Sequence, residues 1–163
     1  LITNKFNMKT VALFLANGFE EIEALGTVDI LRRAGINVVT TSITDVKEVT
    51  GAHDMTIVSD STFSELDFSK VDVIVLPGGM PGAKHLNEHE ELKSKVKEFA
   101  NKGNTVAAIC AAPMVLGGLG ILEGKNATSY PGFEEYLLGA NSTGDKVVVD
   151  KNIITGKGPA FMC

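Results

Sequence analysis

Residues 105–113 read T-V-A-A-I-C-A-A-P. Thr105–Ile109 is a short, mostly apolar run of strand type, and the residues after Cys110 predict a helix over Ala111–Leu119. A cysteine at a strand-to-helix turn has the placement of a nucleophile elbow. The start of the helix would point N–H groups at the sulfur and lower the pKa of the thiol. The alternative is an inert buried cysteine, but the spacing favours a nucleophile.

Strand-like and helix-like segments alternate on both sides of this turn. Val71–Leu76 (V-D-V-I-V-L) has the composition of a strand buried on both faces. Glu20–Ala34 has apolar residues at helical spacing, and Gly35 predicts its end. The alternation predicts a single α/β domain with a mainly parallel sheet. The other expected elements are strands at 10–16 and 36–43, a helix at 90–101, and hairpins at 48–51 with 55–59 and 147–150 with 153–155.

The three sharpest loops all follow strand ends. They are Asn17-Gly18, Pro77-Gly78-Gly79 and Cys110-Ala111. Because ligands bind outside the carboxyl ends of parallel strands, we expect these loops to meet on one rim. The Gly79 and Ala111 N–H groups would then form an oxyanion hole beside the thiol. An ordinary turn is the alternative for Pro-Gly-Gly, and by itself that motif favours the turn.

Acidic residues crowd the first turn of the first expected helix. Glu20, Glu21 and Glu23 follow the first strand closely, so one of them could reach the thiol. A carboxyl group in a partly apolar site stays protonated to higher pH and can donate a hydrogen bond. The alternative is a set of surface acids that the helix dipole favours. For any single glutamate, the residues alone favour the surface.

Composition excludes several classes of protein. The chain has 163 residues and a net charge of −5, without the concentrated basic face that nucleic-acid binding requires. No apolar run approaches the ~20 residues of a membrane span. Two cysteines and no signal-peptide pattern predict a cytoplasmic protein. Residues 1–7 are interpreted as upstream or vector-derived sequence, and residues 8–163 as one domain.

Cofactor motifs are missing from the sequence. The glycines at 117, 118, 120 and 124 match neither a phosphate loop nor a dinucleotide fingerprint, so we predict no nucleotide cofactor. His53, His85 and His89 are interpreted as surface residues. The spacing of the last two suits a metal, but no third ligand is evident, and we predict no metal site.

Five motifs in register resemble the ThiJ/PfpI superfamily, and within it the deglycase branch. They are G-F-E-E-I-E (18–23), V-D-I-L-R-R-A-G (28–35), L-P-G-G (76–79), A-I-C-A-A-P (108–113) and T-G-K-G-P (155–159). The resemblance implies a flavodoxin-like three-layer sandwich and a homodimer. It also implies Cys110 as nucleophile, Glu23 as its protonated hydrogen-bond partner, and Gly79 and Ala111 as the oxyanion site, with Gly78 beside them.

Two departures from the family pattern narrow the expected chemistry. Ala111 stands where protease-like members carry histidine, and Tyr130 stands where some deglycase-branch members carry another. Tyrosine donates a hydrogen bond but is a poor base near pH 7, which argues against peptide hydrolysis. The chain also ends where family members continue into one or more helices that cover the sheet, so we expect an exposed apolar sheet surface.

The resemblance and the elbow together predict an activity. We expect a cofactor-free glyoxalase or deglycase acting on small dicarbonyls such as methylglyoxal, with Tyr130 among the substrate-binding residues. One alternative is a redox sensor in which Cys110 is oxidised. Another is a chaperone-like protein with a vestigial site. A protease or amidase is the least favoured alternative.

Overall fold

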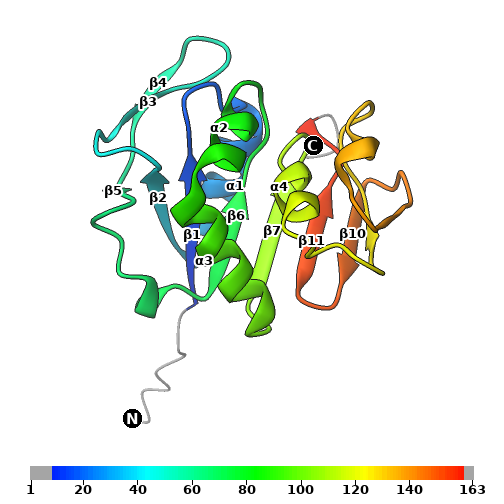
Figure 1. Ribbon diagram of the computed structural model, residues 1–163. Coiled ribbons are helices and arrows are strands. Elements are labelled where there is room, and N and C mark those ends of the chain that lie inside the picture. The colour runs from blue at the N-terminus through cyan, green and yellow to red at the C-terminus, as the bar shows by residue number, and fades with distance from the viewer. Residues whose placement is uncertain (1–8, 160–163) are drawn as a thin grey trace.

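A seven-stranded sheet forms the middle layer of a three-layer α/β sandwich in the computed structural model, which describes residues 9–159 (Figure 1). The strand order is β10-β11-β7-β6-β1-β2-β5. Every pair is parallel except β10 with β11, so the predicted α/β fold with a mainly parallel sheet is confirmed. The strands are β1 (Thr10–Leu15), β2 (Asn37–Ser42), β5 (Ser61–Thr62), β6 (Val73–Leu76), β7 (Thr105–Ile109), β10 (Val147–Asp150) and β11 (Ile153–Gly156).

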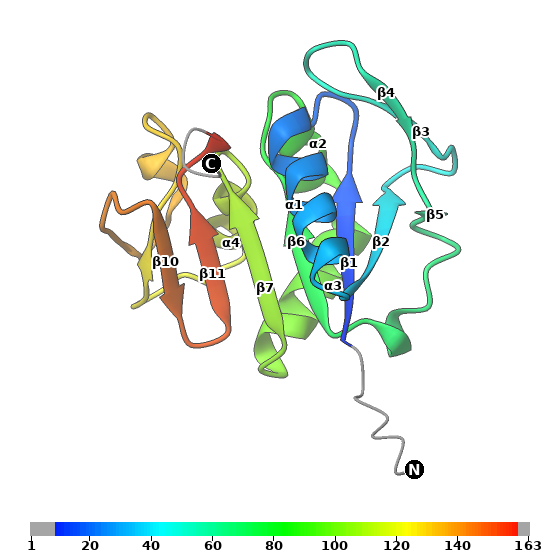
Figure 2. The same ribbon diagram turned by 180° about the vertical axis from the view of Figure 1, so that it is seen from behind.

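Helices cover the two faces of the sheet unequally. α1 (Glu21–Arg33) lies on one face, whereas α2 (Gly82–Glu88), α3 (Glu90–Asn101) and α4 (Pro113–Gly118) lie on the other (Figures 1 and 2). Two short 3-10 helices occupy Phe68–Lys70 and Glu134–Tyr136. None of the helices between residues 9 and 159 has the length and apolar character needed to cross a membrane.

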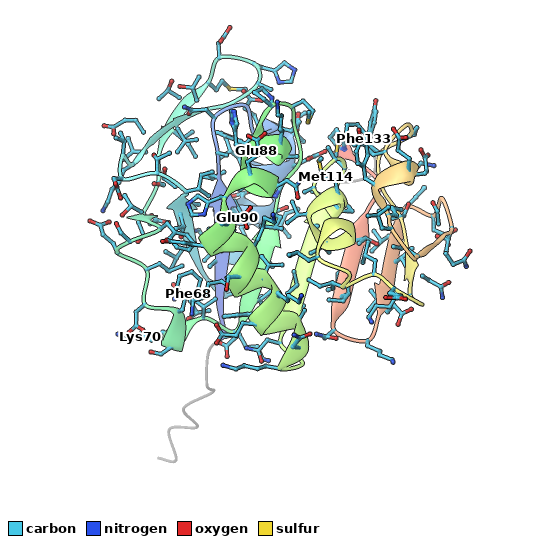
Figure 3. All side chains as sticks on the ribbon, in the orientation of Figure 1. Phe68, Lys70, Glu88, Glu90, Met114 and Phe133 are labelled. Atoms are coloured by element: carbon cyan, nitrogen blue, oxygen red, sulfur yellow. The ribbon has the colours of Figure 1, made fainter. Side chains whose placement is uncertain are left out.

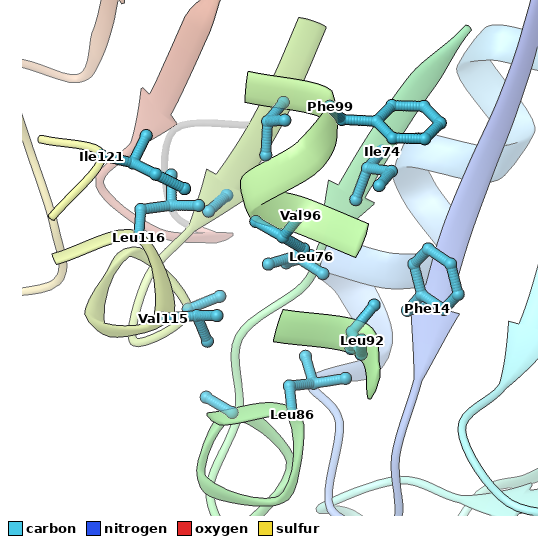
Figure 4. Packing of buried hydrophobic residues seen from close by; sticks show 14 of the residues in the cluster. Phe14, Ile74, Leu76, Leu86, Leu92, Val96, Phe99, Val115, Leu116 and Ile121 are labelled. Carbon is cyan, nitrogen blue, oxygen red and sulfur yellow. The ribbon is translucent and has the colours of Figure 1, made fainter. Parts of the chain in front are cut away.

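The larger hydrophobic core lies between the sheet and α2–α4. Phe14 and Leu76 of the sheet pack against Leu92 and Val96 of α3, and all four are fully buried (Figure 4). α3 presents Leu92, Val96 and Phe99 on one face, as its apolar spacing predicts. A smaller core, which includes Leu13 and Val28, joins the sheet to α1.

Both predicted hairpins are present. β10 pairs with β11, and β3 (Glu48–Thr50) pairs with β4 (Thr56–Val58) beside the main sheet. A further small pair, β8 (Asn126–Ala127) with β9 (Asn141–Ser142), is parallel. Figure 3 places Met114 and Phe133 toward one end of the molecule, away from Phe68 and Lys70.

Two helices differ from the sequence-based expectation. α2 was not predicted, because a seven-residue helix that begins at a glycine offers few periodic positions; Ala83 and Leu86 bury its inner face. α4 begins at Pro113 rather than at Ala111 and ends at Gly118. The residues between Cys110 and Pro113 form a turn instead.

On the sheet face that α1 partly covers, the described residues 9–159 leave several strands without a helix over them. Figure 2 shows β7, β11 and β10 without a helix in front of them. An apolar groove of about 630 Å³ lies there, with Val75, Ala107, Ile109 and Ile154 in its lining. The further helix that the family resemblance implies stays a prediction.

Candidate active site

Cys110 lies at the tip of the turn between β7 and α4. Its φ is 64°, a left-handed conformation that non-glycine residues rarely adopt and that turns the chain sharply. Backbone hydrogen bonds hold it on two sides: its N–H donates to the Gly156 carbonyl (2.9 Å), and its carbonyl accepts from the Tyr130 N–H (2.9 Å). Neighbouring segments thus fix the strained turn.

Glu23 comes from the first turn of α1 and is 1% exposed. Its Oε2 accepts a hydrogen bond from the Gly78 N–H at 2.8 Å. The Cys110 side chain lies beside the same carboxyl group, since both border Gly78. Glu23 Oε1 is buried and has no hydrogen-bond partner among residues 9–159. The interpretation of this glutamate as a surface acid is therefore wrong.

Burial is the main cause of the unusual ionisation of Glu23. It raises the pKa of this carboxyl to about 7, and the nearby charge of Glu20 acts in the same direction. Hydrogen bonds from Cys110 and from the Gly78 N–H act in the opposite direction. A carboxyl with this pKa exchanges its proton near neutral pH, which suits a general acid or base.

The pKa of Cys110 is shifted in the direction opposite to the one predicted from the sequence. Burial, followed by the negative charge of Glu23, raises the pKa of this thiol to about 12, whereas a lowered value was expected. The Gly79 and Ala111 N–H groups oppose the shift but do not reverse it. The resting group is thus a thiol, and a thiolate forms only as its proton leaves for a base such as Glu23.

The Gly78-Gly79 loop approaches the other two loops too closely for side chains. A Cβ at Gly78 would lie 2.6 Å from the Cys110 Cβ and 2.7 Å from Glu23 Oε2. Gly79 has a φ of 89°, and a Cβ there would overlap the Glu20 backbone nitrogen. The loop therefore requires both glycines.

Five of the six predicted site residues surround the Cys110 sulfur and the Glu23 carboxyl group. They are Cys110, Glu23, Gly78, Gly79 and Ala111. The backbone N–H groups of Gly79 and Ala111 lower the pKa of the Cys110 thiol, and the Gly78 N–H donates to Glu23. Tyr130 adjoins them through its backbone, and its half-exposed ring lies beside Gly158. The three loops that leave strand ends do meet on one rim.

Glu21 and His53 form a contact that the sequence did not predict. Glu21 is buried, and it accepts hydrogen bonds from the His53 N–H and Nδ1, both at 2.7 Å. Glu20, Glu21 and His53 place ligand atoms within 4.8 Å of one another, a spacing that would suit a metal. Both Glu21 oxygens, however, already bind His53. We therefore interpret the pair as a structural contact that holds the β3–β4 turn against the start of α1. His53 follows Glu21 by 32 residues, and no local pattern reveals such a pairing.

The other two histidines also have structural partners. His85 Nδ1 lies 2.9 Å from the Asn17 carbonyl oxygen. His89 accepts the Leu92 N–H at the start of α3, and its Nε2 lies 3.0 Å from the Ile43 carbonyl oxygen. Among the described residues, neither histidine contacts Cys110.

Together, the fold and the site define a class: an α/β protein with a cysteine at a strand-to-helix elbow and a buried carboxyl beside it. Comparison with known proteins identifies the family. The model of the DJ-1/PfpI family matches residues 9–162, and the chain belongs to that family.

Individual relatives agree with this assignment. Protein DJ-1 homolog A of Arabidopsis thaliana is 40% identical over 93% of this chain, and a deglycase of Pyrococcus horikoshii is 34% identical over 91% of this chain and 90% of its own length. A DJ-1 superfamily protein of Salmonella typhimurium, solved as a cysteine-to-alanine mutant, is 36% identical with a TM-score of 0.90 over 95% of this chain and 84% of its own. The chain spans only 39% of the Arabidopsis relative's length.

Proposed function

We propose that this protein is a cofactor-free, cysteine-dependent enzyme of the glyoxalase or deglycase type, acting on small dicarbonyls such as methylglyoxal. One arrangement carries the proposal: the buried Glu23 carboxyl, whose pKa burial raises to about 7, lies beside the Cys110 thiol, and the backbone N–H groups of Gly79 and Ala111 act on the same sulfur. Nucleophile, base and oxyanion donors are the parts that addition to a carbonyl needs. The similarity to a deglycase supports the choice of substrate.

The first step follows from the geometry. The Cys110 sulfur forms a bond to the aldehyde carbon while the thiol proton passes to the Glu23 carboxylate. The carbonyl π bond breaks, and its oxygen takes the negative charge beside the N–H groups of Gly79 and Ala111. Glu23 then returns the proton to that oxygen, which completes a neutral hemithioacetal. Thiol and aldehyde are consumed one for one.

The redox-sensor alternative depends on the same residue as the proposed activity. Oxidation to sulfenic acid would use the same Cys110 sulfur, and peptide mass spectrometry after mild peroxide treatment tests it: an unmodified Cys110 would count against a redox sensor. Ala111 supplies no histidine next to the nucleophile, which argues against peptide hydrolysis.

We further propose a cytoplasmic homodimer. A free thiol at Cys110 suits a reducing compartment. α1 exposes Ile22 and Ile30, and the β3–β4 hairpin exposes Met55 and Val58; these apolar side chains would gain from burial against a second copy. Analytical ultracentrifugation of the purified chain tests the dimer, and a monomer at micromolar concentration would contradict it.

The test of the activity is turnover of methylglyoxal by the purified protein and its Cys110→Ser variant. We expect the variant to lose turnover by roughly 100-fold or more, because the hydroxyl of serine is a far weaker nucleophile than a thiol paired with a base. Glu91→Gln, an exposed acid on α3, serves as the folded control. Equal turnover by wild type and Cys110→Ser would reject the proposal.

A further inference from the structure

Glu20 connects two parts of the site without contacting the sulfur. It is the residue before α1, and its Oε2 accepts the Glu23 N–H at 2.7 Å. Its own N–H donates to the Gly78 carbonyl at 2.9 Å. These two contacts tie the first turn of α1 to the loop after β6. A single residue, Glu20, therefore fixes the position of Glu23 relative to its hydrogen-bond donor Gly78.

Glutamate is an unusual choice for this position. Residues that cap the start of a helix are preferentially Asn, Asp, Ser, Thr or Gly, whose short side chains reach the N–H group readily. Glu20 makes the same hydrogen bond with a longer side chain and, in addition, carries a negative charge beside a buried carboxyl group. Capping alone does not explain this residue.

Few titratable groups bear on the Glu23 carboxyl. The Cys110 thiol reaches it from the elbow, and Glu20 acts from the start of α1; the Gly78 N–H is the remaining polar neighbour. The β3–β4 turn contributes His53, which is paired with Glu21 and also feels the charge of Glu20. Glu20 is the charged neighbour that favours a proton on Glu23.

We propose that Glu20 is a positioning residue whose negative charge favours uptake of the thiol proton by Glu23, while its two hydrogen bonds hold Glu23 and Gly78 together. The inference rests on the proposed function in one respect: the proton that Glu23 takes up from the Cys110 thiol is the one that the carbonyl addition uses. Loss of the charge lowers the pH at which Glu23 takes up a proton, and it therefore makes Glu23 a weaker base toward the thiol.

The test measures the titration of Glu23 directly, by the ¹³C shift of its carboxyl carbon, which is assigned through its absence in Glu23→Gln. Glu20→Gln and Glu20→Ser both keep a hydrogen-bond acceptor and remove the charge, so either one decides the question if the other folds poorly. Glu20→Asp keeps the charge and a good cap. Glu91→Gln removes an exposed acid from the first turn of α3, so it matches the change in net charge.

We expect Glu20→Gln and Glu20→Ser to lower the titration midpoint of Glu23 by about half a pH unit or more, the size expected for two like charges several ångströms apart near solvent. Glu20→Asp and Glu91→Gln should stay close to wild type. A midpoint unchanged in Glu20→Gln, or an equal shift in Glu20→Asp, would overturn the proposal. The readout needs no substrate, so it separates this inference from a failure to turn over methylglyoxal.

Discussion

Replacing Glu23 with glutamine should move two properties of Cys110 in opposite directions. The glutamine keeps the shape of the side chain and an oxygen for the Gly78 N–H, but it carries no charge and accepts no proton. The thiol should therefore react faster with a small alkylating reagent, while turnover of methylglyoxal should fall.

The expected size comes from the causes of the Cys110 shift. Burial, the negative charge of Glu23 and the side-chain interaction with Glu23 raise the pKa of this thiol to about 12; glutamine removes the charge and leaves the burial in place. If the charge accounts for about one pKa unit, the thiolate fraction at pH 8 rises about tenfold, since one unit equals ~1.4 kcal/mol. Loss of a positioned base should lower kcat by roughly 10²- to 10⁴-fold.

The assay is iodoacetamide labelling at several pH values, followed by peptide mass spectrometry so that Cys110 is separated from Cys163. Glu91→Gln controls for the change in net charge. Slower labelling of Cys110 in Glu23→Gln would refute the reasoning, because it would mean that Glu23 stabilises the thiolate rather than opposing it. Unchanged turnover would refute the role of Glu23 as the base.

Three further predictions concern the framework around the site. Gly79→Ala should lower the free energy of unfolding by roughly 2 kcal/mol or more and abolish turnover, because its φ is 89° and the added Cβ meets the Glu20 backbone; wild-type denaturation would contradict the close approach. His53→Ala should lower the melting temperature at neutral pH. The pair raises the pKa of His53, so this difference should shrink as pH rises through that value and the histidine loses its charge; a difference that grows with pH would be inconsistent with the pair. His89→Ala should cost about 1–2 kcal/mol by losing the cap of α3, and His89→Asn should recover part of it; equal loss in both variants would exclude capping.

The fold could be predicted from sequence because its signals are local. V-D-V-I-V-L at Val71–Leu76 and the apolar spacing of Glu90–Asn101 each report an element that the structure contains, within two residues at either end. α2 was not predicted because its stability comes from Ala83 and Leu86 packing into the core. Its seven residues are too few to show a helical period of apolar residues.

The site was less predictable because burial is a property of the whole fold. Acidic residues at the start of a helix usually face solvent, yet Glu21 and Glu23 are both buried. The β3–β4 turn covers the first of them: the Ala52 N–H donates to the Phe19 carbonyl, and His53 binds Glu21 directly. Neither contact leaves a pattern in the sequence, and Glu23 was selected only through the resemblance.

The wrong direction for the Cys110 pKa has the same origin. The sequence rule assumed that a helix starts at Ala111 and directs its dipole at the sulfur. α4 starts at Pro113 and has only six residues, so the N–H groups of Gly79 and Ala111 act without a long helix behind them. They meet two stronger opposing effects, burial and the charge of Glu23. When the Glu23 carboxylate takes up the thiol proton, its negative charge disappears. The transfer therefore removes one of the two effects that disfavour the thiolate. The charge of Glu23 opposes ionisation of Cys110 only before the proton moves.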